Sequence, residues 1–440
     1  MRELTVKGNV FKISYGDTYK LVKIPSQSLS SVLQVSNLPP LKNPEEAIKE
    51  SLKSPCNLKT LKKLVIPGNK IIIIIPDLTR PMPLKLLIPI ILDELLSAGI
   101  QYKDITLLIA LGTHRPMTQI EIKELLGEEV TEKVKVVNHN WADNNQLVDM
   151  EITELGTPIK VNRLVFDADF IIGIGSVKPH RSAGWSGGGK IIDPGVCGYD
   201  TVGLTHWRSI EFETLDIIGK VDNPIRNEIE KVAEKVGINF IINVVLNRNN
   251  KISFVSSGHF ISAHKKCVEF AEKMYRTDIP GEADILIAGT GTWDTDFWTA
   301  VIVLFTAEYL VKNNGTVILF AKCPDGIAPE HPDIVKYGYI GYKIIKDLVK
   351  SGKLKDLAAA THMVIVSKVI IDKAIDCILV SEGVSEKIAF KLGLLWAESP
   401  QDAVKQAYNK FKNRNSKTYI INGDNIADTL ILPRYKGGDK

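Results

Sequence analysis

Five consecutive isoleucines, residues 71–75, constrain the fold of this chain more than any other feature. β-Branched side chains favour extended backbone, and a run that is apolar at every position is typical of a strand buried on both faces. Such strands belong to parallel sheets that helices cover on either side. The run therefore predicts an α/β protein in which residues 70–76 form a central strand.

Strands and helices alternate along the rest of the chain, as expected for this class. We predict further strands at residues 105–111, 133–137, 170–174, 239–246, 285–288, 316–320 and 378–380. We predict helices at residues 83–98, 118–126, 263–275 and 298–312. Thr118 is the expected N-cap of the second helix, with Glu121 as its capping-box partner. The β-branched content of residues 361–374 favours a strand, whereas their length and their place before a strand favour a helix. We interpret the segment as a helix.

The Pro- and Gly-containing segment at residues 276–284 separates two series of strands and helices. We therefore predict two α/β domains, residues 1–275 and residues 276–440, and 440 residues are enough for both.

Composition excludes several classes of partner. The net charge is +4, and the lysines are spread along the chain, which argues against nucleic acid and against a membrane surface. The five cysteines form no CxxC pair, as expected in a reducing compartment. The chain shows neither a signal-peptide core nor a long apolar span. We expect a soluble cytoplasmic protein.

Three polar loops directly follow predicted strands, at residues 77–81, 112–116 and 178–181. Open α/β sheets bind ligands at the carboxyl ends of their strands. Because every one of these loops carries an arginine or a histidine, they predict a single site. Each residue also has a structural interpretation: Asp77 as a helix cap, Arg80 in a surface ion pair, and His114 and His180 as turn histidines.

The third loop leads into Ser186-Gly187-Gly188-Gly189-Lys190. Glycines let backbone N–H groups close on an anion, and a helix that begins there would add its positive end. The spacing is not that of a P-loop, so Lys190 could instead be a nucleophilic amine, or the segment could be a flexible loop. His206 follows Lys190 closely in the chain and could be packed or a metal ligand, and Cys197 is a weaker candidate ligand.

Taken together, four segments resemble the nickel-dependent lactate racemase family. They are PDLTRPMP (76–83), LGTHRPMT (111–118), KPHRSAGWSGGGKIIDPG (178–195) and THWRS (205–209). Their order and spacing match from the first segment to the last. The resemblance implies an active site in the cleft between two α/β domains. The first domain would bind the cofactor and carry the catalytic residues, and the second would contribute to the substrate pocket.

The resemblance also implies a role for each matching residue. Lys190 would carry a covalently attached nickel-pincer nucleotide, a pyridinium mononucleotide that binds nickel through one carbon and two sulfurs. His206 would be the nickel ligand, and His114 and His180 the two acid–base groups. Arg80 would hold the substrate carboxylate. The remaining cofactor contacts would be Asp77, Thr79, Gly187, Gly188 and Gly189.

These residue types suit the racemisation of a 2-hydroxy acid. The Cα–H of such an acid is a poor proton donor, but it can leave as hydride while a neutral histidine takes the hydroxyl proton. Two histidines serve the two enantiomers, and the cofactor carries the hydride. Enzymes that synthesise the cofactor would be further partners.

The second domain departs from the lactate-specific pattern. Where the family carries a Tyr-Gln-x-x-Lys run, this chain has Trp298, Thr299 and Ile302, so the carboxylate-binding lysine is missing. Met363 replaces an expected tryptophan. Lys322 is a candidate replacement for the lysine, although it could be an ordinary surface residue. We expect Trp298, Thr299 and Lys322 to bind a 2-hydroxy acid that need not be lactate.

Two other functions stay open. One is a non-catalytic carrier of nickel or nucleotide. The other is a nicotinamide-dependent 2-hydroxy acid dehydrogenase, which the absence of a GxGxxG motif after a strand disfavours.

Overall fold

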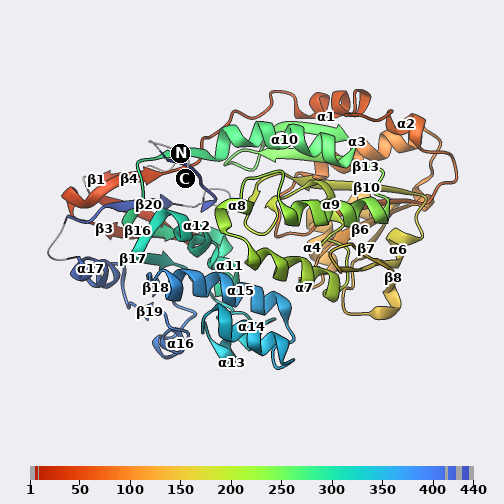
Figure 1. The fold of residues 1–440 in the computed structure, drawn as a ribbon. Coiled ribbons are helices and arrows are strands. Elements are labelled where there is room, and N and C mark those ends of the chain that lie inside the picture. The colour runs from red at the N-terminus through yellow and green to blue at the C-terminus, as the bar shows by residue number, and fades with distance from the viewer. Residues whose placement is uncertain (1–4, 8, 412–414, 423–428, 436–440) are drawn as a thin grey trace. The chain divides into compact units, whose positions relative to one another are not determined.

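The computed structural model of the chain describes residues 5–7, 9–411, 415–422 and 429–435. It divides into two compact units. The first unit comprises Asn37–Ser209 and Asp216–Met274, and the second comprises Met1–Ser36, Ile210–Leu215 and Tyr275–Lys440. Each unit is built on its own six-stranded sheet with helices, so the predicted fold class of two α/β domains is confirmed (Figure 1).

The sheet of the first unit has the strand order β14-β13-β10-β5-β6-β7. Its strands are β5 (Ile71–Pro76), β6 (Ile105–Ala110), β7 (Lys135–Asn138), β10 (Phe170–Ser176), β13 (Phe240–Leu246) and β14 (Ile252–Gly258). Neighbouring strands run parallel except β13 and β14, which are antiparallel. Two short antiparallel pairs stand apart: β8 (Leu147–Ile152) with β9 (Pro158–Asn162), and β11 (Pro179–His180) with β12 (Gly184–Trp185).

Both faces of the isoleucine strand are buried. Ile71, Ile73 and Ile75 belong to one hydrophobic cluster, whereas Ile72 and Ile74 belong to another. The first cluster includes residues of α1 (Pro44–Lys53), α2 (Leu61–Leu64), α3 (Leu84–Ser97), α4 (Gln119–Leu126) and α5 (Glu128–Lys133). The second includes residues of α6 (Arg163–Phe166), α7 (Tyr199–Arg208), α9 (Pro224–Val236) and α10 (Phe260–Tyr275). Helices thus cover the sheet on both sides, as the run predicts.

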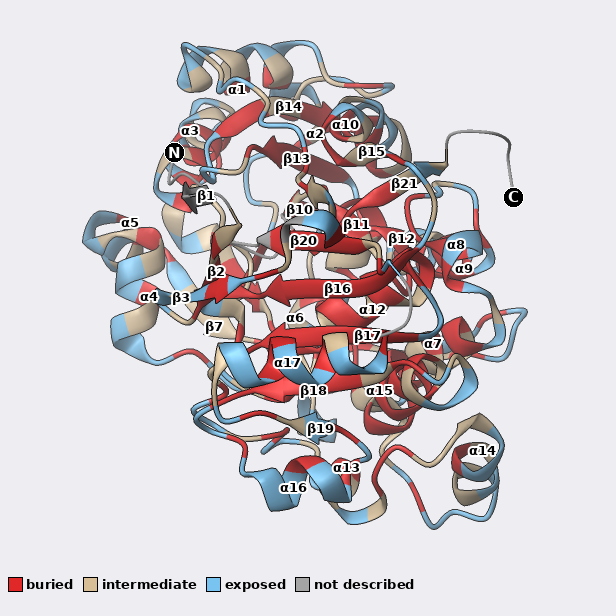
Figure 2. Cartoon of the chain, turned by 90° about the vertical axis from the view of Figure 1, so that its left-hand side faces the viewer, coloured by how far each residue is buried: buried red, intermediate tan, exposed pale blue. Residues whose placement is uncertain are grey.

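The sheet of the second unit is parallel throughout, in the order β19-β18-β17-β16-β20-β4. Its strands are β4 (Leu29–Leu33), β16 (Ala283–Gly289), β17 (Val311–Phe320), β18 (Asp376–Val380), β19 (Leu395–Trp396) and β20 (Thr418–Asn422). Strands β16 and β18 are almost wholly buried, and so is β17 from Gly315 to its end (Figure 2). The hairpin of β2 (Val10–Tyr15) and β3 (Thr18–Lys23) shares a hydrophobic cluster with these strands and with α17 (Pro400–Lys410).

The N-terminal segment departs from the expected division at residue 275. Met1–Ser36 belongs to the second unit, because β4 pairs in parallel with β20 as a sheet edge, with Leu29 opposite Thr418 and Leu33 opposite Ile421. The two strands come from opposite ends of the chain, so no local pattern in the sequence reveals the pairing. One boundary between the two units does lie between Met274 and Tyr275, next to the Pro- and Gly-containing segment.

The helix predictions have mixed outcomes. The capping box of α4 is present, with Thr118 and Glu121 as its partners. Residues 361–374 are helical as interpreted, in α15 (Leu357–Ser367) and a π-helical turn (Lys368–Asp372). The single helix at 298–312 is wrong: α11 (Phe297–Ala300) and α12 (Ile302–Leu310) replace it, and α12 ends at Leu310 because Val311 already pairs with Ala283 in the sheet. In the part of the chain that is described, no helix has both the length and the hydropathy needed to cross a membrane.

The described residues of the second unit also form α13 (Asp333–Tyr337), α14 (Tyr342–Lys350) and α16 (Glu386–Lys391).

Candidate active site

The three polar loops meet at one edge of the first unit's sheet. Strands β6, β5 and β10 are parallel neighbours, and Pro76 at the end of β5 lies opposite Ala110 at the end of β6. Asp77 follows β5, His114 follows β6, and His180 follows β10. The sheet order therefore brings to one edge residues that are far apart in the chain.

Asp77 orients His114. The imidazole Nδ1 lies 2.7 Å from Asp77 Oδ2, and Thr79 Oγ1 donates to Oδ1 at 2.6 Å. Burial acts to raise the pKa of Asp77, but the bond to His114 and the charges of His114 and Arg80 lower it below its usual value. Because the carboxylate accepts the Nδ1 proton, the lone pair of Nε2 remains available to take a proton.

Arg80 is anchored by its neighbour in the same loop. Its Nη1 donates to the carbonyl oxygen of Thr79 at 3.2 Å and to Thr79 Oγ1 at 3.1 Å. Burial lowers the pKa of Arg80, and the charge of Asp77 opposes the shift. The loop thus holds a guanidinium beside the carboxylate that orients His114.

His180 lies in the hairpin of β11 and β12. The backbone N–H of Ser182 donates to its Nδ1 at 3.2 Å, which places the proton of the neutral ring on Nε2. Burial, followed by the charge of Lys190, lowers the pKa of His180 well below its ordinary value. His180 is therefore neutral near pH 7, with its hydrogen bonds arranged differently from those of His114.

Lys190 is a strongly perturbed amine. Burial, with the positive charges of Arg80 and Arg226, lowers its pKa to about 7. Near neutral pH the Lys190 amine is therefore uncharged in about half of the protein molecules, and the uncharged form is the one that a nucleophile requires. Lys178, which the sequence reasoning did not single out, is also buried, and burial, with the charges of Arg80 and Lys190, lowers its pKa well below the usual value.

The glycines before Lys190 are packed against protein. No α-helix begins there, contrary to one expectation, only a 3-10 turn (Gly188–Ile191). Gly188 adopts a left-handed backbone with φ of 60°, and a Cβ there would lie 3.0 Å from the His264 ring. Its N–H donates to Asn243 Oδ1 at 2.9 Å. Close packing therefore explains glycine at this position, and a contact with a cofactor phosphate stays a prediction.

Arg226 of α9 clamps the loop between His180 and Lys190. Its guanidinium donates to three backbone carbonyls: Nε to Ala183 at 3.3 Å, Nη1 to Gly187 at 3.1 Å, and Nη2 to Trp185. The arginine is fully buried, and burial lowers its pKa to about 10. A motif search misses it, because Arg226 stands well beyond Lys190 in the chain, on another element.

His206 faces the same cavity as Lys190. This cavity is lined by His180, Ser182, Ala183, Lys190, Pro194, Thr205, His206 and Ile229. His206 Nδ1 donates to the carbonyl of Val202 one turn earlier in α7 at 2.8 Å, which leaves the Nε2 lone pair for a ligand. Burial, with the charge of Lys190, lowers the pKa of His206 to about 4, so the ring is neutral at pH 7.

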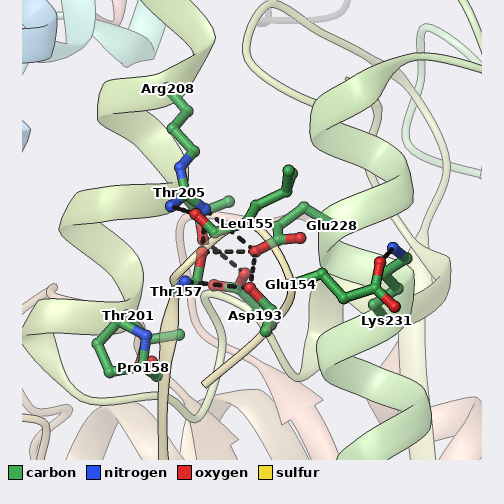
Figure 3. Close-up of polar contacts among 11 residues, drawn as sticks. Glu154, Leu155, Thr157, Pro158, Asp193, Thr201, Thr205, Arg208, Glu228 and Lys231 are labelled. Atoms are coloured by element: carbon green, nitrogen blue, oxygen red, sulfur yellow. Dashed lines mark hydrogen bonds and ion pairs between the residues drawn. The ribbon is translucent and has the colours of Figure 1, made fainter.

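A polar network holds α7 in place (Figure 3). Thr205 Oγ1 donates to Asp193 Oδ2 at 2.8 Å, and burial raises the pKa of Asp193 to about 7. Arg208 Nη1 lies 3.1 Å from Glu228 Oε1, which also accepts from Thr157 Oγ1 at 2.5 Å. These contacts anchor the helix on both sides of His206.

The second unit holds Trp298 and Thr299 on α11. The Trp298 ring stacks on His331, with ring centroids 4.0 Å apart, and on His362, with centroids 4.5 Å apart. His331 Nδ1 lies 2.7 Å from Asp356 Oδ2. Neither histidine stands in a sequence motif, so the sequence did not single them out. The hydroxyl of Thr299 donates to Asp296, the N-cap residue of α11.

Lys322 follows β17 and lies near Asp17, with 3.7 Å between Lys322 Nζ and Asp17 Oδ1. Its backbone N–H donates to Asp294 Oδ2 at 2.6 Å. Met363 is fully buried, and its neighbour His362 is the residue that stacks on Trp298.

Cys197 is not a thiolate in this structure. It is fully buried, and burial raises the pKa of its thiol well above the ordinary value. Among the residues that the structure describes, no group of three or more His, Cys, Asp or Glu side chains could hold a metal ion.

Comparison with known proteins places the chain in a family. Residues 15–215 match the lactate racemase N-terminal domain, and residues 279–427 match the lactate racemase C-terminal domain. This chain belongs to the lactate racemase family. It is therefore an isomerase of the racemase class.

Curated members of the family match most of the chain. Lactate racemase of Lactiplantibacillus plantarum is 32% identical over 289 residues, which are 64% of this chain and 67% of that protein. Lactate racemase of Thermoanaerobacterium thermosaccharolyticum is 28% identical over 320 residues, 72% of this chain and 75% of that protein.

Solved structures agree with this family. The lactate racemase apoprotein of T. thermosaccharolyticum superposes with a TM-score of 0.85 at 25% identity, covering 97% of this chain and 100% of that one. A Thermotoga maritima protein has a TM-score of 0.70 at 24% identity, covering 91% of this chain and 100% of its own, and shows the shared fold.

Proposed function

We propose that this lactate racemase family member racemises or epimerises a 2-hydroxy acid by reversible hydride transfer, using a nickel-pincer nucleotide tethered to Lys190. One observation carries the proposal: an amine with a pKa of about 7 and a neutral imidazole line a single cavity. The first suits a covalent attachment, and the second suits a nickel ligand.

The residues present fit this cofactor. Lys190 supplies the amine for the linkage, and His206 has Nε2 available because Nδ1 is bonded to Val202. A lone histidine is sufficient where the cofactor itself provides the other donors to the metal. When bound, the nickel-pincer nucleotide supplies a hydride acceptor beside the substrate.

The chain's own residues position the substrate and move its hydroxyl proton. Arg80, held by Thr79, offers a guanidinium to the substrate carboxylate. His114 accepts the hydroxyl proton at Nε2, and the carboxylate of Asp77 stabilises the resulting imidazolium through Nδ1. We propose His180 as the acid–base group for the opposite enantiomer; to take the hydroxyl proton at Nε2 it would carry its ring proton on Nδ1 and give up the contact with the Ser182 N–H.

The substrate is a 2-hydroxy acid that need not be lactate. The family resemblance implies a lysine at the position of Ile302, so one charge-assisted hydrogen bond to the carboxylate would be lost. Such a bond contributes roughly 1.5–3 kcal/mol, which is about tenfold or more in affinity for a small acid. Trp298 and the two histidines stacked on it provide an aromatic surface in the second unit.

The test is a panel of single-enantiomer 2-hydroxy acids with protein that is co-produced with the cofactor-synthesis enzymes. Peptide mass mapping should find the added mass on Lys190, and chiral chromatography should show racemisation without net redox turnover. An active enzyme with wholly unmodified Lys190 would refute the tether. Net oxidation of the acid would favour a dehydrogenase, and a loaded protein that turns over no acid would favour a carrier. If lactate proves the best substrate by a wide margin, the substrate proposal fails while the racemase mechanism stands.

A further inference from the structure

One buried hydrogen bond joins the segment that carries Lys190 to the helix that carries His206. Asp193 follows Lys190 by three positions, and Thr205 directly precedes His206 on α7. Thr205 Oγ1 donates to Asp193 Oδ2 at 2.8 Å (Figure 3). Asp193 is 0% exposed and Thr205 is 2% exposed, so water does not compete for this bond.

The other side-chain bonds of α7 shown in Figure 3 lead elsewhere. Thr201 Oγ1 donates to the carbonyl of Pro158 in β9 at 2.7 Å, and Arg208 pairs with Glu228 of α9. Thr205 alone among these three residues reaches the segment of the tether. The second carboxylate oxygen of Asp193 is buried with no hydrogen-bond partner among the described residues, a costly arrangement for a side chain whose only task is to fill space.

We infer that Thr205 and Asp193 are positioning residues that fix the nickel ligand His206 relative to the cofactor's attachment at Lys190. This inference rests on the proposed function. A cofactor tethered at one residue and ligated through its metal at another needs both anchors at a constant separation, because a small displacement of the imidazole weakens the metal bond. The tether holds the nucleotide covalently, so a looser His206 should release nickel without releasing the nucleotide.

Thr205→Val tests the inference, because valine keeps the shape of threonine and removes the hydroxyl. Thr201→Val is the matched control, since it removes a similar buried hydroxyl from the same helix one turn earlier. Both variants are co-produced with the cofactor-synthesis enzymes. The readouts are the mass added at Lys190 and the rate of nickel loss to a chelator, followed by metal analysis. Thr205→Ser keeps the hydroxyl and serves as the conservative rescue.

We expect all three variants to carry the Lys190 adduct. Thr205→Val should lose nickel about tenfold faster than wild type, the factor that corresponds to one hydrogen bond of typical net strength. Thr201→Val and Thr205→Ser should stay within about twofold of wild type. Equal nickel loss from Thr205→Val and Thr201→Val would overturn the inference.

The two proposals fail in different ways. Wild-type protein without an adduct at Lys190 would refute the proposed function, whereas loaded Thr205→Val with normal nickel retention would refute only the positioning role. If Thr205→Val does not fold, Asp193→Leu takes its place, because leucine is similar in size but has no oxygen to accept the Thr205 hydroxyl. It should release nickel faster than wild type, and unchanged release would again overturn the inference.

Discussion

Replacing Arg226 tests how the loop between His180 and Lys190 is held. The guanidinium donates to the carbonyls of Ala183, Trp185 and Gly187, and such charged bonds contribute about 1.5–3 kcal/mol each, or roughly 4–9 kcal/mol together. Burial lowers the pKa of Arg226 from 12.5 to about 10, a penalty of roughly 3 kcal/mol on the charged side chain. The difference predicts that Arg226→Met lowers the free energy of unfolding by about 3 kcal/mol.

The assay is urea unfolding followed by circular dichroism. Arg115→Met is the control, because Arg115 pairs with Glu121 at 2.6 Å on the surface and should cost less than about 1 kcal/mol after solvent screening. Hydrogen exchange of the amides between residues 181 and 190 should also accelerate in Arg226→Met, since the clamp acts on that loop. A loss below about 1 kcal/mol, with unchanged exchange in the loop, would refute the reasoning.

Three further predictions concern single side chains. The pKa of Lys190 is about 7, so labelling of the unloaded protein by an amine-reactive reagent, followed by peptide mass mapping, should rise with pH and be half-maximal near pH 7; a midpoint near pH 10 would contradict the burial argument. Asp77→Asn removes the carboxylate that orients His114 and should lower kcat of the loaded enzyme about a hundredfold or more, while an unchanged kcat would remove Asp77 from the mechanism. Gly188→Ala should lower the free energy of unfolding in urea by roughly 2–4 kcal/mol, because the new methyl group would contact a histidine ring and the backbone there is left-handed. Gly237→Ala, with a φ of 85° and open space around it, should lower it by about 1 kcal/mol. Equal losses would show that packing is unimportant at Gly188.

The local sequence was sufficient to predict the features that depend on neighbouring residues in the chain, namely the strands and the loops that follow them. The five isoleucines form a strand because β-branched residues favour extended backbone, and their uniform apolar character correctly predicts helices on both sides of the sheet. The loops after β5, β6 and β10 lie at one edge because parallel strands end together. The ranges that define the family resemblance are likewise short and contiguous.

Contacts between distant segments could not be predicted in this way. The place of β4 in the second unit depends on pairing with β20 near the other end of the chain, and no local pattern encodes that partner. The clamp by Arg226, the bond between Asp193 and Thr205, and the stacking of Trp298 on His331 follow from how whole elements pack.

The sequence by itself indicated which residues are candidates for the chemistry, and the tertiary structure decided the protonation state of each. Lys190 has an ordinary amine in an unfolded chain, and about half of it is neutral at pH 7 only because folding buries it beside Arg80 and Arg226. His206 is a neutral imidazole with a defined tautomer for the same reason, since burial disfavours its charge and Val202 accepts its Nδ1 proton. Desolvation and long-range charge depend on the positions of all neighbouring atoms, which exist only once the chain has folded.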